Sequence, residues 1–457
     1  MLMCAGMSAL VPLSSPFELL LWAAPLPSDS EFVLEDPLAL DYLGQQVGYF
    51  LLPALTTRSG HAQYFAVVLY GLDLAERALA EYELPDEDRH RRELFERWER
   101  FWALALVESH GGGFGRANSD AIRGARGVAK AWFSGERPLP RDYRLISRQG
   151  ELGGLGAYLV PLRDLGLVYP GSLRVTPAAG PILDAFWGEP GTMHMQRFDN
   201  WAMHVLAPDC TRIERKFQNF RLSTLGERSR LTSILGREAQ QRRVFEAVVE
   251  RAPPPTAQVA RLREQAARLG IDEPRDVLEA MIAGRCGEVE LALRDLLALA
   301  LAFGDASYAI RDAFDAVYGD ITDAGFTATR QEVVARVLAG ERHERLQAAS
   351  AALLAAPELT RLQRLPMHSR LFLRLAEDLR GSAAPAALDH LLAFHRRVQR
   401  ERSSGDSWIA EADGALQIAQ TRYTGHRFAA RFPGFKLNVL RNLLETTGRL
   451  ATQGATP

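Results

Sequence analysis

Hydrophobic residues recur at helical spacing along most of the chain, and this pattern predicts a mainly α-helical protein. Over residues 38–107 the spacing predicts three to four packed helices. Beyond the proline run at 253–255, helices are expected over residues 258–269, 274–283, 289–318, 331–354, 360–379 and 386–400. The helix at 289–318 is apolar nearly all round, so we expect it to be the central helix of the second half.

Residues 142–187 change the pattern in an order that is typical of a winged helix. A short helix, a glycine-rich turn at 150–154 and a second helix come first, and two β-prone runs around Pro170 and Gly171 follow. Thr176, which precedes a proline, then marks the start of a third helix. We therefore predict a winged helix embedded between helical domains.

The C-terminal end carries a different signal. Asp413 and Gly414 lie between two short apolar runs, and this dipeptide is typical of a type I′ hairpin turn. Four leucines at helical spacing over residues 437–444 predict a closing helix. Residues 422–449 also hold six basic residues against one glutamate, a patch that suits an acidic partner subunit as well as a phosphate backbone.

These signals divide the chain into six predicted segments. They are a tail over residues 1–35, an N-terminal helical domain over 36–135, the winged helix over 136–188, a basic helical connector over 189–252, a helical domain over 257–400, and the hairpin with its closing helix over 401–452. The tail is apolar but lacks a basic region and is interrupted by two prolines and Glu18, so a signal peptide is not expected.

Charge and cysteine content narrow the class of protein. The 457 residues carry a formal net charge of -2, so binding to nucleic acid or to an anionic membrane would depend on local basic patches. Three scattered cysteines are too few for a disulfide framework and favour a reducing compartment. The longest later apolar run, residues 296–303, is too short to span a bilayer. We expect a cytoplasmic protein without membrane contact.

The winged helix leaves two functions open. Arg148, Arg163 and Arg174 are its candidate nucleic-acid contacts. In DNA-reading proteins the second helix enters the major groove. Here that helix has Arg163 as its only basic residue and is interrupted by Pro161. A winged helix that serves protein contacts or packing is therefore as well supported as one that binds DNA.

A stronger basic patch follows at residues 211–230, where six basic residues face two glutamates. Arg212, Arg215 and Lys216 are the candidate contacts to a nucleic-acid backbone. Two phenylalanines lie among them and would stack on bases if they were exposed. The same spacing describes an amphipathic helix whose aromatic residues enter the core, and we favour this second interpretation.

Signatures of catalysis and metal binding are incomplete. The chain has no Walker A lysine motif and no G-x-S-x-G serine motif. The residues of zinc-ligand or nuclease type within one short span are His194, His204, Asp209, Cys210, Glu214 and Lys216. Their spacing fits neither a zinc site nor the two-strand site of a PD-(D/E)xK nuclease. We therefore expect a protein without a catalytic residue, metal or cofactor. Two other functions remain as alternatives, a winged-helix transcriptional regulator and a metal-dependent nuclease.

Three segments carry a family resemblance. Residues 41–44, 51–65 and 391–408, together with the winged helix, resemble uncharacterised bacterial proteins that are encoded in anti-phage defence islands. Genes of this kind lie beside helicases, nucleases or SMC-like ATPases. The resemblance implies a non-enzymatic subunit of a multi-protein complex that acts on foreign DNA, with an ATPase or nuclease encoded nearby among its partners.

Overall fold

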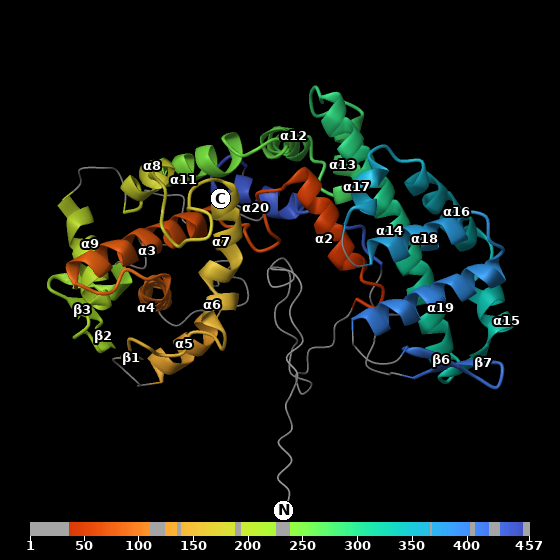
Figure 1. Cartoon of the computed structure of the whole chain (residues 1–457), viewed down its shortest axis with the longest axis horizontal. Coiled ribbons are helices and arrows are strands. Elements are labelled where there is room, and N and C mark those ends of the chain that lie inside the picture. The colour runs from red at the N-terminus through yellow and green to blue at the C-terminus, as the bar shows by residue number, and fades with distance from the viewer. Residues whose placement is uncertain are drawn as a thin grey trace, which may run out of the picture. The chain divides into compact units, whose positions relative to one another are not determined.

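The computed structural model describes residues 36–109, 124–134, 139–187, 193–224, 238–365, 368–402, 407–419 and 430–450. The chain divides into two units, Met1–Glu35 and Asp36–Pro457. The predicted tail forms the first unit and lies outside the described residues. The second unit is mainly α-helical, as the hydrophobic spacing predicts, with a few short strands (Figure 1).

The first helices are α2 (Leu40–Leu51), α3 (Ala62–Glu81), α4 (Asp88–Ser109) and α5 (Ala125–Phe133). Helices α3 and α4 pack against each other, and α5 packs against α4. The α3–α4 contact is closest at Gly71, beside the fully buried indole of Trp98. The indole nitrogen donates a hydrogen bond to the carbonyl oxygen of Val67 at 3.0 Å, which fixes the ring between the two helices.

The segment predicted as a winged helix contains, in order, β1 (Leu139–Pro140), α6 (Gln149–Leu152), α7 (Gly154–Asp164), η1 (Pro177–Ala179) and α8 (Gly180–Asp184). The second helix agrees with the predicted range, whereas α6 and α8 have only four and five residues. The two β-prone runs meet at a single antiparallel bridge between Val168 and Val175. This turn is therefore shorter than a two-stranded wing.

The basic segment that follows departs from the prediction. After α9 (Met193–Leu206) come three strands of two residues each, β2 (Arg212–Ile213), β3 (Lys216–Phe217) and β4 (Phe220–Arg221). The prediction of an amphipathic helix over these residues is wrong, because Gln218 has a φ of 53° and the chain reverses there into an antiparallel pair. Helix α11 (Glu238–Phe245) and the π-helix η2 (Glu246–Glu250) complete this part.

The second half is built around one long helix. Its helices are α12 (Thr256–Arg268), α13 (Pro274–Ile282), α14 (Leu291–Asp323), α15 (Arg330–Val333), η3 (Val334–Leu338), α16 (Glu341–Leu354), α17 (Leu359–Gln363), α18 (Ser369–Leu379) and α19 (Ala384–Glu401). As predicted, α14 is central, since α13, α16 and η3 all pack against it. The helix predicted over 331–354 is interrupted at Gly340, whose φ of 74° ends the first part.

Strands β6 (Ile409–Ala412) and β7 (Ala415–Ile418) form an antiparallel hairpin around Asp413 and Gly414. Both turn residues have positive φ, 52° and 76°, as a type I′ turn requires. Strand β5 (Thr327–Thr329), which the sequence pattern does not reveal, pairs with the other edge of β7. The three strands thus form one sheet in the order β5-β7-β6.

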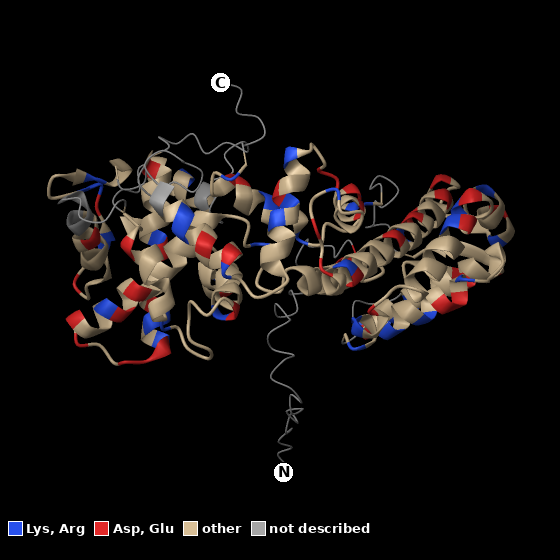
Figure 2. Ribbon diagram, turned by 90° about the horizontal axis from the view of Figure 1, so that it is seen from above, with Lys and Arg blue, Asp and Glu red and all other residues tan. Residues whose placement is uncertain are grey.

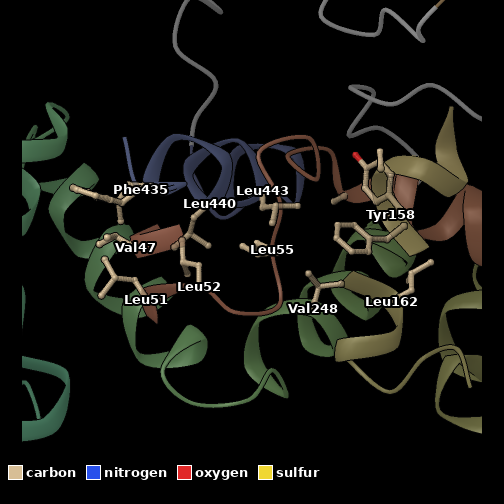
Figure 3. Packing of buried hydrophobic residues seen from close by; sticks show 14 of the residues in the cluster. Val47, Leu51, Leu52, Leu55, Tyr158, Leu162, Val248, Phe435, Leu440 and Leu443 are labelled. Carbon is tan, nitrogen blue, oxygen red and sulfur yellow. The ribbon is translucent and has the colours of Figure 1, made fainter. Parts of the chain in front are cut away.

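The first and last described helices both pack against elements that are distant in the chain. Helix α2 packs against α14 of the second half, and α20 (Leu437–Thr446) packs against α3 and α11 of the first half as well as against α12. Figure 3 shows Leu440 and Leu443 of α20 close to Leu52 and Leu55, which follow α2. The buried hydrophobic residues accordingly form one cluster that runs from the first described helix to the last.

Candidate nucleic-acid interface

Charges of both signs are distributed over the helices. Figure 2 shows Lys and Arg interspersed with Asp and Glu along most of them. This distribution agrees with the formal net charge of -2 and leaves no general attraction for an anionic partner. A nucleic-acid site therefore has to be found in places where several basic side chains lie together without acidic neighbours.

The basic segment after α9 places cations and aromatic rings on opposite faces. Strand β3 pairs with β4 so that Lys216 lies opposite Arg221 and Phe217 lies opposite Phe220. Because directly opposite residues of an antiparallel pair share one face, the two cations lie on one side and the two rings on the other. Lys216 and Arg221 are exposed, whereas both phenylalanines are half-buried.

The aromatic face packs onto helix α9. The ring of Phe217 stacks on Trp201 with centroids 5.8 Å apart, and Phe220 makes an edge contact with Phe198 at 5.2 Å. Phe217 also stacks on the ring of His204 at 4.6 Å. The aromatic residues therefore enter the core, as the favoured interpretation of the sequence expects, and do not form a platform for bases.

A polar network anchors α9 to α3. The Arg77 guanidinium donates two hydrogen bonds to Asp199, at 2.7 and 2.8 Å, and the Tyr70 hydroxyl donates another. The Trp187 indole donates to the Tyr70 oxygen at 2.9 Å. Burial acts to raise the pKa of Asp199, but the hydrogen bonds from Arg77 and Tyr70 outweigh burial and hold this pKa below its usual value. The support beneath the basic strands is thus fixed by charge as well as by packing.

The sequence-predicted residues of this segment differ in their surroundings. Arg212 and Lys216 are exposed, and neither has an acidic partner in the part of the chain that the structure describes. Arg215 instead binds Glu108, with its Nε 2.8 Å from the carboxylate oxygen. Arg221 is also exposed and also has no acidic partner among the described residues, so the segment holds three such cations. We call Arg212, Lys216 and Arg221 the β2–β4 cation face: Lys216 and Arg221 share one side of the β3–β4 pair, and Arg212 lies in β2, with the exposed Glu214 between it and Lys216 in the chain.

Further positive charge lies beside this face. Strand β1 pairs with β2, and the backbone N–H of Arg141 donates to the carbonyl oxygen of Thr211 at 2.9 Å. Burial and the positive charge of Arg141 lower the pKa of Arg97, whereas Glu93 and Asp142 act in the opposite direction. Arg141 therefore adds positive charge near β2, and the acidic residues beside it offset part of that charge.

The three predicted contacts in the winged-helix segment are engaged within the chain. Arg148 pairs with Glu151 at 3.1 Å. Arg163 donates to the carbonyl oxygen of Ser172 at 2.7 Å, which closes the turn between the two β-prone runs. Arg174 pairs with Asp86 and lies 3.6 Å from Glu76, so it ties this turn to the loop before α4. Each of these arginines has a structural role that needs no nucleic acid.

Helix α7, the expected reading helix, turns its apolar face inward. Leu155, Tyr158 and Leu162 are buried, and the Tyr158 ring stacks on Tyr64 with centroids 5.1 Å apart. Gly156 and Asp164 are exposed two turns apart on the other face, with Val160, 42% exposed, between them. This exposed row carries no hydrogen-bond donor in its side chains, whereas the commonest specific contacts to bases in a major groove are made by the donors of Arg, Lys, Asn and Gln.

A buried carboxylate fixes the start of α7. Glu99 of α4 is 1% exposed and accepts hydrogen bonds from the backbone N–H of Gly154 at 2.6 Å and from the Gln149 amide at 2.8 Å. Burial raises the pKa of Glu99 from 4.5 to about 7, although both hydrogen bonds favour the charged form. The carboxylate lies at the helix N-terminus, where negative charge is stabilised.

Glu99 is therefore expected to make stability depend on pH. With a raised folded pKa, its stabilising contribution is complete below about pH 4.5 and is lost as the pH rises through about 7. Glu99→Gln stays neutral, so its free energy of unfolding relative to the wild type should rise by about 1 kcal/mol or more across that interval. Urea denaturation at several pH values measures this difference, with Glu93→Gln on the exposed side of α4 as the control. Parallel pH profiles of wild type and Glu99→Gln would contradict it.

Three described basic residues of the second patch are used within the chain, whereas Arg431 is exposed and has no acidic partner among the described residues. Arg441 pairs with Glu445 at 2.8 Å and with Asp272, and Arg449 pairs with Glu264 at 3.3 Å. Lys436 is buried. The remaining basic residues of that patch between 420 and 429 lie outside the described residues. Arg441 and Arg449 therefore join α20 to α12 and to the loop that follows it.

The described residues hold no group of three or more His, Cys, Asp or Glu side chains that could bind a metal ion. His204, Asp209 and Glu214, the nuclease-type candidates, are thus not brought together. His204 stacks on Phe217, and the Cys210 thiol lies 3.4 Å from the carbonyl oxygen of Arg212. The His194 side chain lies outside the described residues.

Comparisons with protein-family models, curated proteins and solved structures found no match for this chain. A search of the described helices for a stretch long and apolar enough to cross a membrane found none. The class that the fold defines is therefore a mainly helical protein with a short, exposed basic strand segment, and the geometry of that segment is what bears on function.

Proposed function

We propose that this chain is a non-enzymatic, cytoplasmic subunit of a bacterial defence complex and that it contacts the backbone of foreign DNA without reading sequence. One observation carries the DNA contact. The β2–β4 cation face presents three cations that have no acidic partner among the described residues, and two of them, Lys216 and Arg221, lie on a strand pair whose opposite side is packed onto α9. The family resemblance of residues 41–44, 51–65 and 391–408 supports the defence role.

The form of the cation face favours phosphate contacts. Guanidinium and ammonium groups bind phosphate oxygens, and such contacts position a duplex without carrying sequence information. Strands of two residues are too short to fill a major groove, and α7 offers no donors on its exposed row. Binding through these cations should release counterions and therefore weaken steeply with salt.

The winged-helix segment has a different proposed role. Val160 and Tyr169 are large hydrophobic residues that are 42% and 47% exposed, and the three candidate arginines of this segment are all engaged within the chain. Two exposed apolar side chains suit a protein surface better than they suit a phosphate backbone. We assign this segment to assembly with partner subunits, such as an ATPase or nuclease encoded nearby.

The triple variant Arg212→Gln, Lys216→Gln, Arg221→Gln tests the DNA contact. Its affinity for a fluorescein-labelled DNA duplex of mixed sequence should fall by about tenfold or more, and the slope of log K against log salt should shrink by about 0.9 for each phosphate that is no longer neutralised. Fluorescence anisotropy of the full chain over a salt series measures both quantities.

The control removes the same charge elsewhere. Arg89, Arg243 and Arg345 are exposed, and each pairs with an acidic residue three or four positions away in the chain. Their replacement by glutamine also lowers the net charge by three. We expect this control variant to bind the duplex nearly as the wild type does. Equal losses of affinity in both variants would mean that only net charge matters and would overturn the proposed contact face.

A further inference from the structure

Helices α18 and α19 carry a second set of exposed cations that the sequence pattern does not single out. Its members are Arg370 and Arg374 of α18 and Arg396, Arg397 and Arg400 of α19. Each is exposed and has no acidic partner among the described residues. We call these five residues the α18–α19 arginine face.

The geometry of the two helices brings the five arginines to one end of the pair. The short connection over residues 380–383 makes α18 and α19 antiparallel neighbours. His368 Nδ1 lies 3.0 Å from Glu401 Oε2, so the start of α18 lies beside the end of α19. Arg370 and Arg374 are one turn apart, as are Arg396 and Arg400, a rise of about 6 Å in each row.

Packing holds both rows in place. The opposite faces of the helices are buried, including Phe372 and Leu375 of α18 and Leu391 and Val398 of α19. The backbone that carries the arginines is therefore rigid, and only the long side chains need to be ordered on binding. A preformed row of cations binds an anionic partner at a lower entropic cost than a flexible one.

Three described acidic residues lie near these five arginines. Glu401 follows Arg400 and is bound to His368, and Glu377 and Asp378 lie one turn after Arg374 in α18, where Asp378 approaches His390 at 3.8 Å. None of the three forms an ion pair with the arginines, and the five cations outnumber them. Helix stability does not account for Arg370 either, because a cation in the first turn faces the positive end of the helix dipole. The concentration of charge therefore points to a ligand.

We propose that the α18–α19 arginine face binds the sugar–phosphate backbone of DNA, as a second contact beside the one in the proposed function, on which it rests. Arginine pairs with phosphate oxygens through two parallel hydrogen bonds. A protein partner would require apolar anchors in the centre of the interface. The large hydrophobic residues that the structure shows as exposed lie elsewhere and include none on α17, α18 or α19. Two separate contacts on one duplex would strengthen binding through effective concentration.

The variant Arg374→Gln, Arg396→Gln, Arg400→Gln tests this second contact. It removes three charges, as do the β2–β4 variant and the control variant of Arg89, Arg243 and Arg345, so the three can be compared directly. With the same labelled duplex and salt series, we expect the affinity to fall by about threefold to tenfold and the salt slope to become smaller. Replacement of the same three residues by lysine should restore most of the salt slope, since the charge remains. Circular dichroism confirms that each variant is folded.

The outcomes separate the two proposals. If this variant binds like the control while the β2–β4 variant binds weakly, the second contact is overturned and the first stays intact. The reverse result would support the second contact and overturn the first. A wild type that does not bind the duplex would overturn both. Unchanged DNA binding together with weaker binding of poly-L-glutamate would overturn the DNA contact in favour of an acidic protein partner.

Discussion

Replacing Gly71 by alanine should lower the free energy of unfolding by about 1–3 kcal/mol. A Cβ atom at this position would lie 2.6 Å from the indole nitrogen of Trp98 and closer still to its Cδ1. The ring cannot move aside freely, because it is fully buried and its N–H donates a hydrogen bond to the carbonyl oxygen of Val67. Helices α3 and α4 would have to separate. Urea denaturation followed by circular dichroism measures the destabilisation.

The same substitution at Gly127 is the matched control. Gly127 lies in α5, is exposed, and has no atom within 4 Å of the Cβ that alanine would add. Because alanine favours a helix over glycine, Gly127→Ala should stabilise the protein by about 0.5–1 kcal/mol. The two variants should therefore shift the denaturation midpoint in opposite directions. An unchanged or higher midpoint for Gly71→Ala would contradict the close α3–α4 contact.

Above about pH 10, where Lys436 is neutral in the folded chain and deprotonates in the unfolded one, its replacement by methionine should cost about 2–4 kcal/mol of stability. Lys436 is 5% exposed, and its Nζ donates to the carbonyl oxygens of Leu52 at 3.2 Å and of Leu55 at 2.5 Å. These carbonyls lie just beyond the end of α2, and that of Leu52 also accepts the backbone N–H of Leu55 at 3.2 Å. Methionine fills similar space but donates no hydrogen bond, so two buried acceptors would be left without this donor. Chemical denaturation of the full chain measures the difference.

The effect of this substitution should also depend on pH. Burial lowers the pKa of Lys436 from 10.5 to about 6. Between pH 6 and pH 10.5 this side chain is therefore protonated in the unfolded chain but not in the folded chain. The contribution of this residue to stability therefore grows as the pH rises above about 6. Lys216→Met is the control, since Lys216 is exposed, and it should weaken DNA binding without lowering stability. Equal stability of the two lysine variants at all pH values would refute the role of Lys436.

Long helices could be predicted because a buried face repeats over many turns. In α14, buried residues such as Leu297, Phe303 and Ile310 recur at helical spacing over nine turns, and no alternative structure fits that repeat. Asp413 and Gly414 are similarly informative, since few residues adopt two consecutive positive φ angles. Such signals are local, and tertiary contacts do not override them.

The strands of the basic segment could not be predicted for the opposite reason. Phe217 and Phe220 are three residues apart, which suits a helix, but Gln218 adopts a left-handed conformation and places the two rings side by side in a hairpin. Strands of two residues are too short to show alternation. Of the predicted contacts, Arg174 is engaged by Asp86, which lies 88 residues away in the chain. The arginine face could not be predicted either, because its rows come from two different helices.

The packing of α2 against α14 has a consequence for biosynthesis. The apolar face of α2 is covered by α14, which ends more than two hundred residues later in the chain. At a translation rate of about 5–20 residues per second, α2 waits roughly 10–50 s for its packing partner. The nascent N-terminal half therefore leaves the ribosome with an uncovered hydrophobic helix, and we expect this helix to be a site of chaperone binding until the C-terminal half has been made.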